Sequence, residues 1–266
     1  MSNPNKININ REKCARDGIC IEVCPCNIFR ADETGLAEVN PEFAPTCVAC
    51  GHCVAVCPTN AIALNDIDGT MLEKAPEKLE NFDSFSSLVK SRRSIRSFKP
   101  DQLPIEELKK LLELTRWAPT AKNSQALSWV LVNGHERVQK LSEAVIEAFR
   151  TEDRMEPLVS AFELGHDIIH RRAPHLLVAY AHEKYKWGTY DASIALNTIE
   201  LGARCMGIGT CWGGFTTWAS TISPIVAQAL ELPAEHKVYA VLMLGKPNFK
   251  YNKIPQRNAL KLKVLT

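Results

Sequence analysis

The placement of cysteine constrains this chain more than any other feature of its sequence. Eight of the ten cysteines lie between residues 14 and 57, and the remaining two are Cys205 and Cys211. The N-terminus, MSNPNKININREK, contains no apolar stretch that could act as a secretory signal, so we expect a cytoplasmic protein. Disulfides are rare in that compartment, and clustered cysteines there are typical of metal ligands. The sequence therefore predicts a metal-binding module near the N-terminus.

The second cysteine run has the spacing of an iron–sulfur ligand motif. Cys47, Cys50, Cys53 and Cys57 follow the pattern C-x2-C-x2-C-x3-C, and Pro58 stands directly after the last cysteine. Such short spacings allow one loop to wrap a cubane cluster, with three thiolates on one cluster and the fourth on another. A zinc site or a disulfide framework suits this spacing and compartment less well.

The first run contains the same motif with one departure. Aligned on Cys24 and Pro25 it reads C-x2-D-x2-C-x3-C-P, with Cys14 and Cys20 in place and Asp17 where a second thiolate is expected. Together the two runs resemble the bacterial two-cluster ferredoxins over about residues 6–66. The resemblance implies a ferredoxin-like domain over residues 1–66 with two 4Fe–4S clusters. It implies two ligand sets: Cys24, Cys47, Cys50 and Cys53; and Cys14, Asp17, Cys20 and Cys57.

Asp17 would face the fourth iron of the second cluster. A carboxylate is a harder ligand than a thiolate and binds iron less tightly among sulfides. We therefore expect that corner to be labile, with conversion to a 3Fe–4S form. One alternative stays open: Cys26 could replace Asp17 as the ligand, although the second run has Thr59 at the equivalent place. Otherwise Cys26 is a small packing residue.

The rest of the chain predicts a second domain over residues 84–266, after a polar linker at residues 67–83. Strands are expected at 126–133, 175–181 and 237–245, and helices near 103–119, 135–150, 155–172 and 191–207. This alternation indicates an α/β or α+β domain with an apolar sheet between helical layers. The net charge of +2 gives no reason to expect nucleic acid, and no run of about 18 apolar residues predicts a membrane span.

Basic and amide side chains of this second domain could bind a cofactor. SRRSIRSF places Arg92, Arg93, Ser94 and Arg96 within five positions, where they could form a phosphate clamp or a solvated basic turn. WAPTAKNSQ contributes two amides that could hydrogen-bond the edge of a heterocycle or take part in ordinary turns. These amides belong to Asn123 and Gln125.

A glycine-rich stretch, MGIGTCWGGF, follows later in the chain. It does not match G-x-G-x-x-G, so a dinucleotide-binding Rossmann fold has little support. Glycines still let backbone amides come close to a flat ligand. The stretch contains Gly207, Gly209, Gly213 and Gly214.

Taken in order, these stretches resemble the nitroreductase family of FMN enzymes from about residue 84 to the C-terminus. The shared motifs are R-R-S-x-R, A-P-[ST]-x-x-N-x-Q, G-x-G-T-x-W-G-G-F and a final LGKP…PQR. The resemblance implies an α+β sandwich with a central, mainly antiparallel sheet flanked by helices. It also implies an extensive homodimer with FMN bound at the subunit interface.

The resemblance further assigns cofactor contacts to particular residues. Arg92, Ser94 and Arg96, with Arg93 beside them, would hold the FMN phosphate and ribityl chain. Asn123 and Gln125 would lie at the isoalloxazine, and Trp212, Gly213 and Gly214 at the reactive edge of the flavin. Arg257 would supply a late phosphate contact. The family often has a second basic residue two positions earlier, where this chain has Pro255, so Lys253 or Lys250 would have to replace it.

The remaining candidate ligands have structural explanations. His166 and His170 have i, i+4 spacing but lack the acidic partner of an H-E-x-x-H motif, so we expect them on an exposed helix face. Cys205 and Cys211 are expected to be core thiols rather than a redox pair.

The combination of modules predicts a cytoplasmic oxidoreductase and electron-transfer protein whose cofactors, not acidic or nucleophilic side chains, carry the chemistry. We expect electrons to pass between a donor, two iron–sulfur clusters and FMN, with reduction of nitroaromatic, quinone-like or other conjugated acceptors. The donor would be a ferredoxin-like protein or NAD(P)H. The alternative is an electron-transfer or redox-sensing module without small-molecule turnover of its own.

Overall fold

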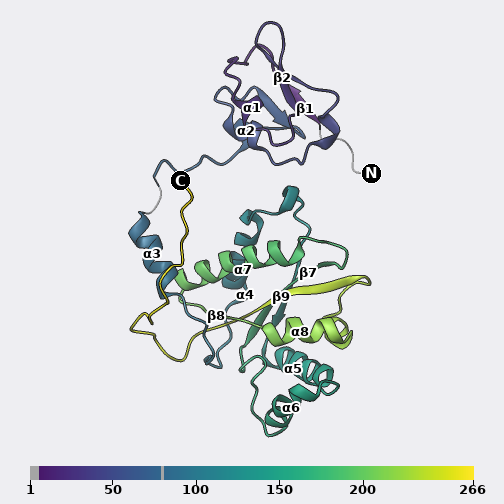
Figure 1. The fold of residues 1–266 in the computed structure, drawn as a ribbon, viewed down its shortest axis with the longest axis vertical. Helices are drawn as coiled ribbons and strands as arrows, with labels where there is room; N and C mark the ends of the chain where they lie inside the picture. The colour runs from purple at the N-terminus through teal and green to yellow at the C-terminus, as the bar shows by residue number, and fades with distance from the viewer. Residues whose placement is uncertain (1–5, 79–80) are drawn as a thin grey trace. The chain divides into compact units, whose positions relative to one another are not determined.

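The chain divides into two units, each with its own sheet and apolar core (Figure 1). The computed structural model describes residues 6–78 and 81–266. Residues 6–78 and 121–124 form the first unit, and residues 81–120 and 125–266 form the second. Residues 1–5 of the predicted N-terminal domain and residues 79–80 of the predicted linker lie outside the described residues.

The first unit is built on two small antiparallel sheets. One has the order β1-β4-β5, and the other pairs β2 with β3. Two short helices and two 3-10 turns connect the strands. The bounds are β1 Ile7–Ile9, α1 Ile19–Glu22, β2 Phe29–Ala31, β3 Ala37–Val39, η1 Ala44–Thr46, α2 His52–Val56, β4 Ile62–Leu64, β5 Ile67–Asp68 and η2 Gly69–Met71.

The core of the first unit is small and lies among its cysteines. Ile28, Phe29, Val54 and Ile62 are each at least 96% buried, and most of the cysteines in residues 14–57 pack against them. Part of the predicted linker belongs to this unit, because residues 67–68 form β5 and pair with β4. The polar composition of residues 67–83 gave no indication of this short antiparallel strand.

The second unit contains a four-stranded antiparallel sheet of order β6-β7-β9-β8. Its strands are β6 Ser128–Asn133, β7 His175–His182, β8 Gly209–Trp212 and β9 His236–Gly245. Three of them confirm the strands expected from apolar runs. The fourth, β8, lies inside the glycine-rich stretch, which was interpreted only as a place for close backbone approach.

Helices cover both faces of this sheet (Figure 1). The bounds in the second unit are α3 Phe82–Ser91, α4 Ile105–Leu112, η3 Glu113–Trp117, α5 His135–Phe149, η5 Asp153–Met155, α6 Glu156–Glu163, α7 Gly188–Cys205, α8 Gly214–Ile222 and α9 Ile225–Ala229. The 3-10 turn η4 Ala121–Asn123 groups with the first unit. Within the described residues, none of these helices combines the length and apolar character that crossing a membrane requires.

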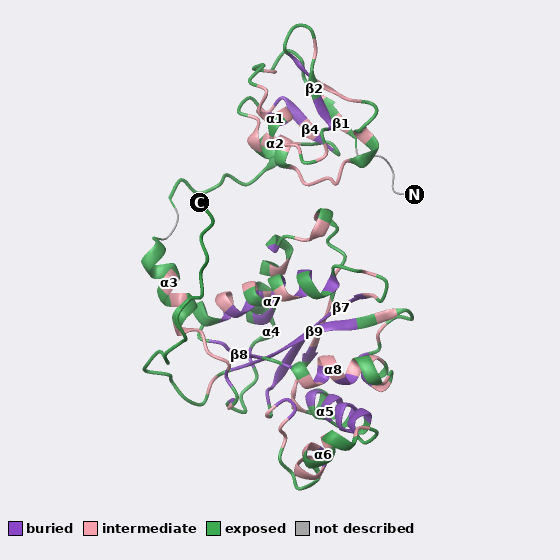
Figure 2. Ribbon diagram, viewed as in Figure 1, coloured by how far each residue is buried: buried purple, intermediate pink, exposed green. Residues whose placement is uncertain are grey.

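Strand alternation explains why both faces of the sheet are apolar. In β7, Leu176 and Val178 point into the core shared with α5 and α8, whereas Leu177 and Ala179 point into the core shared with α4 and α7. All four residues are fully buried, and Figure 2 shows the central strands and the inner faces of α5 and α7 as buried. This sheet between helical layers is the α+β sandwich expected from the sequence.

The helix expected at residues 155–172 is shorter than predicted. It ends at Glu163, and Gly165 takes a positive φ of 86°. The following turn is held by the Asp167 carboxylate, which accepts hydrogen bonds from the backbone N–H groups of Ile169 and His170. The prediction that His166 and His170 share an exposed helix face was therefore wrong, because His170 is fully buried.

His170 bridges two helices through its ring nitrogens. Its Nδ1 lies 2.7 Å from the Ser142 hydroxyl of α5, and its Nε2 lies 2.6 Å from the Thr216 hydroxyl of α8. Burial lowers the pKa of His170 to about 4, although the nearby Asp167 charge opposes the shift. The ring is therefore neutral in the folded protein at neutral pH.

This buried histidine predicts acid sensitivity. Between pH 6.5 and about 4 the unfolded chain binds a proton at this residue that the folded chain does not, so stability falls as pH falls. His170→Gln should flatten that slope by up to about 1.4 kcal/mol per pH unit. The free energy of unfolding, measured across this range, tests the prediction. His166→Gln, at the exposed neighbour, should leave the slope unchanged; equal slopes in wild type and His170→Gln would contradict it.

Candidate cofactor site

The cysteines of the first unit lie in two groups, and the ligand sets implied by the ferredoxin resemblance stay a prediction. Cys24, Cys47, Cys50 and Cys53 line one cavity, together with Cys26. Burial, with the charges of the other three nearby, raises the pKa of Cys53 to about 11. The second set comes together around Cys20. Burial raises the pKa of its thiol, with further contributions from the charges of Cys14, Asp17 and Cys57.

Backbone hydrogen bonds support two of these sulfurs. The N–H of Ile28 donates to Cys24 Sγ at 3.3 Å, and the N–H of Ala61 donates to Cys57 Sγ at 3.2 Å. Burial opposes ionisation of Cys57, but hydrogen bonds from Ala61 and Thr59 outweigh it and lower its pKa. Donors directed at sulfur stabilise a thiolate, which is the form that binds metal.

No three His, Cys, Asp or Glu side chains in residues 6–78 and 81–266 are arranged to hold a single metal ion. The predicted metal site is therefore not present as a preformed one-ion centre. A four-iron cluster is larger than one ion, so its ligands stand farther apart. Cys26 is half-buried beside the first set, and His52 is exposed at the start of α2.

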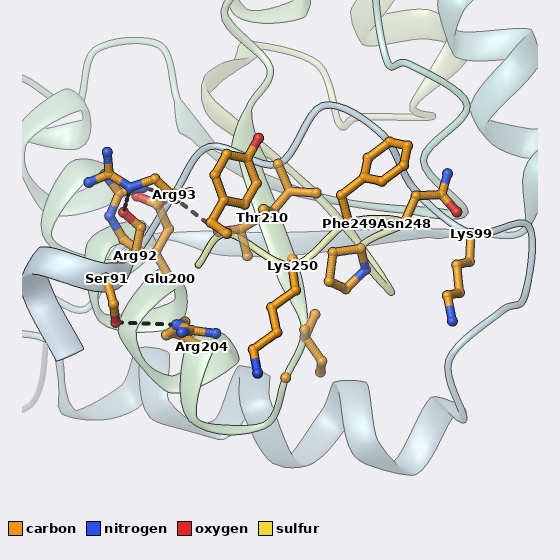
Figure 3. A pocket seen from close by; sticks show the side chains of 16 residues that line it. Ser91, Arg92, Arg93, Lys99, Glu200, Arg204, Thr210, Asn248, Phe249 and Lys250 are labelled. Atoms are coloured by element: carbon orange, nitrogen blue, oxygen red, sulfur yellow. Dashed lines mark hydrogen bonds and ion pairs between the residues drawn. The ribbon is translucent and has the colours of Figure 1, made fainter. Parts of the chain in front are cut away.

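A basic pocket lies in the second unit, where three chain segments meet (Figure 3). Arg92 and Arg93 follow α3, Arg204 lies in the last turn of α7, and Lys250 follows β9. The backbone of β8 forms another wall. The Cβ of an alanine at Gly209 would lie 2.8 Å from Ile95 Cγ1, so the strand passes close to residue 95 only because glycine stands there.

A buried carboxylate organises one wall of this pocket. Glu200 of α7 has only 5% of its side chain exposed, and its Oε1 accepts a 2.9 Å hydrogen bond from the Arg92 guanidinium. Oε1 also accepts from the Thr210 hydroxyl at 3.2 Å, and Oε2 accepts from Trp212 Nε1 at 2.9 Å. Glu200 was not among the residues predicted from the sequence. Its only signal there is that it is the single charged residue in the stretch IALNTIELGA.

The basic residues predicted to form one phosphate clamp line two different pockets. Ser94 forms a parallel bridge with Thr210, and the N–H of Ile95 donates to the Thr210 carbonyl at 2.7 Å. This short pairing passes between two pockets. Arg92 lines the first, whereas Arg96 lines a separate, open one with Arg171 and Arg172. Arg96 is not among the residues that line the pocket of Arg92.

The other predicted contacts are distributed along the chain. Gly213 donates its N–H to the Val241 carbonyl at 2.8 Å, so that donor is already engaged, and Gly214 begins α8. Asn123 groups with the first unit and Gln125 with the second. Among the late basic residues, Lys250 lines the basic pocket, whereas Lys253 and Arg257 are exposed elsewhere.

The two cysteines of the second unit differ in environment. Cys211 is buried in the core, as expected, and its thiol pKa is raised by burial. Cys205 is exposed at the end of α7, so the expectation that it is a core thiol was wrong.

Comparison with known proteins assigns the second unit to a family. Residues 89–246 match the model of the nitroreductase family. A candidate NADH dehydrogenase/NAD(P)H nitroreductase of Archaeoglobus fulgidus is 31% identical over 60% of this chain and 83% of its own length. The chloronitrobenzene nitroreductase of Comamonas testosteroni is 26% identical over 59% of this chain and 84% of its own length.

The fold agrees with that assignment. The crystal structure of a nitroreductase with bound FMN from Bacteroides fragilis superposes with a TM-score of 0.56 and 24% identity, covering 68% of this chain and 96% of that one. The family match begins at residue 89 and does not include the cysteines of residues 14–57. The chain belongs to the nitroreductase family of oxidoreductases.

Proposed function

We propose that this chain is an oxidoreductase that uses FMN and two iron–sulfur clusters to reduce nitroaromatic, quinone-like or other conjugated acceptors. The observation that carries the FMN part is the basic pocket of Figure 3, in a family whose members include a structure with bound FMN. Arg92 and Arg93 from one segment and Lys250 from another line this pocket, and their positive charges suit a phosphate group.

The residues of the second unit fit an FMN cofactor in other respects. Arg92 uses one N–H group on Glu200 and has further donors for a phosphate oxygen. Trp212, 39% exposed, stands beside Gly214 at the start of α8, where helix N–H groups lack intrahelical acceptors. When bound, FMN would supply one- and two-electron transfer, and the protein would position it.

The dispersal of the other predicted contacts fits a homodimeric site. Arg96, Asn123, Gln125 and Arg257 do not line the Arg92 pocket of one chain. Under the proposal, FMN lies at the subunit interface, so a second copy could supply those that the first does not. Relatives often have a basic phosphate contact at the position of Pro255, and in this chain Lys250, rather than Lys253, takes over that contact.

The first unit fits two 4Fe–4S clusters. The cavity lined by Cys24, Cys47, Cys50 and Cys53 and the N–H groups directed at sulfur both support this proposal. Cys14, Cys20 and Cys57 would hold the other cluster, with Asp17 at its fourth corner. The Asp17 carboxylate accepts a hydrogen bond from the N–H of Ile19 at 3.1 Å, which orients one of its oxygens. The donor would be a ferredoxin-like protein or NAD(P)H.

Cofactor analysis of the full chain, purified without oxygen, tests the proposal. We expect about one FMN and about eight irons per chain, or about seven if the Asp17 cluster is a 3Fe–4S form. Turnover of a nitroaromatic acceptor with reduced ferredoxin or NAD(P)H should accompany that content. FMN without iron would reject the cluster proposal, and cofactor reduction without acceptor consumption would favour an electron-transfer module instead.

A further inference from the structure

The Glu200 carboxylate accepts hydrogen bonds from two parts of the second unit that lie far apart in the sequence. One is the basic segment after α3, through Arg92, and the other is β8, through Thr210 and Trp212. All three donors converge on a carboxylate whose side chain is 5% exposed. A buried carboxylate is costly unless it is paired and hydrogen-bonded, and here both oxygens have donors.

The hydrogen bond to Glu200 determines how the Arg92 guanidinium is oriented in the pocket. Its side chain is 25% exposed, and the guanidinium is held at one end by Glu200 while it lines the basic pocket with Arg93 and Lys250 (Figure 3). A guanidinium is planar, so one anchored N–H fixes the directions of the others. An anion entering the pocket therefore meets donors that are already oriented, and less side-chain freedom is lost on binding.

The same carboxylate fixes Trp212. The indole N–H donates to Oε2, so the ring cannot turn without breaking that hydrogen bond. Trp212 is followed by Gly213, where an added Cβ would lie 2.8 Å from Val241 Cγ1, so the backbone there is packed tightly against β9. The indole orientation is consequently set by the side-chain contact with Glu200.

We propose that Glu200 is a positioning residue that orients Arg92 toward the FMN phosphate and at the same time fixes the Trp212 indole. This inference rests on the proposed function, because it requires FMN to bind with its phosphate at Arg92. Glu200 itself does not contact the cofactor. Its effect on phosphate binding is exerted through Arg92, and its effect on the indole is exerted through Oε2.

A double-mutant cycle measures the first effect. Affinities of the apoprotein for FMN and for riboflavin, which lacks the phosphate, are compared in wild type, Glu200→Ala, Arg92→Ala and the double variant. We expect Glu200→Ala to lower the ratio of FMN to riboflavin affinity about tenfold, and to have no further effect when Arg92 is already alanine. Glu147→Ala, at an exposed Arg150 pair, is the matched control and should leave the ratio unchanged.

Glu200→Gln tests the effect of Glu200 on the Trp212 indole. It also provides a second variant if Glu200→Ala does not fold. Its amide oxygen can still accept from Arg92 and Thr210, but its NH2 group then faces the Trp212 N–H, donor against donor. The affinity ratio should stay within about threefold of wild type. The Trp212 contribution to fluorescence, obtained against the same variant with Trp212→Phe, should shift.

The outcomes separate this inference from the function on which it rests. Equal losses of FMN and riboflavin affinity in Glu200→Ala, additive losses with Arg92→Ala, or an unchanged Trp212 emission in Glu200→Gln would overturn the positioning role. If the wild-type protein binds FMN no better than riboflavin, or binds neither, the proposed phosphate site itself is wrong.

Discussion

The Cys53→Ala variant should retain about half of the wild-type iron and acid-labile sulfide, because under the proposed ligand sets one of two four-iron clusters would lose a ligand. Cys53 lines the cavity with the other three cysteines of its set. Cys53 is partly buried, and alanine offers no metal-binding atom. Iron and sulfide measured in protein prepared without oxygen test this expectation. Electron paramagnetic resonance should show the surviving cluster.

Cys26→Ala is the matched control, because Cys26 lines the same cavity. Under the proposed ligand set it should keep the full iron content. A loss of iron in Cys26→Ala as large as that in Cys53→Ala would instead make Cys26 a ligand in this cavity and overturn the proposed ligand set. Unchanged iron in both variants would contradict the cluster assignment.

The Arg92→Ala variant should bind FMN at least about tenfold more weakly than wild type, while its affinity for riboflavin changes little. The guanidinium points into the basic pocket and is the donor that Glu200 holds in place. Its loss removes charge-assisted hydrogen bonds that only the phosphate can use. Titration of apoprotein with each ligand, followed by flavin fluorescence, measures both affinities.

Arg116→Ala provides the control for Arg92→Ala. Arg116 is an exposed arginine paired with Glu113 on η3, and it is not among the residues that line the pocket. Its replacement should alter neither affinity. Full retention of FMN by Arg92→Ala would show that the phosphate lies elsewhere, and the pocket containing Arg96, Arg171 and Arg172 would then be the first alternative to test.

The sheet could be predicted because burial leaves a strong pattern in its strands. β7 and β9 are continuous apolar runs, since side chains on both of their faces are covered by helices. β8 lacks such a run. Its four residues include a glycine required by the approach of Ile95, and glycine is a weak signal for a strand.

The candidate site was only partly predictable from the sequence. Arg92 and Arg93 could be found because several cations stand together, and the structure places them in one pocket with Lys250. The separation of Arg92 from Arg96 could not be foreseen, because it depends on the pairing of Ser94 with Thr210, which are 116 positions apart. Glu200 could not be predicted for a similar reason. Its partners come from other segments, and its own surroundings are ordinary helix.

The ligand sets of the N-terminal unit stay a prediction, because they were implied by the resemblance to two-cluster ferredoxins. Cys24, Cys26, Cys47, Cys50 and Cys53 line one cavity, and the charges of Cys14, Asp17 and Cys57 act on Cys20. Because each loop is short, the spacing alone limits which cysteines can lie together. The state of the Asp17 corner depends on iron affinity, which spacing does not report.

The most direct test of the central claim is a reductive titration of the cofactor-complete protein without oxygen, followed by optical and electron paramagnetic resonance spectra. NADH, NADPH and a reduced ferredoxin are added in separate experiments. We expect at least one donor to produce both flavin bleaching and iron–sulfur signals in the same chain. Flavin bleaching with no cluster signal, up to full reduction, would contradict the claim that FMN and iron–sulfur clusters work together in this protein.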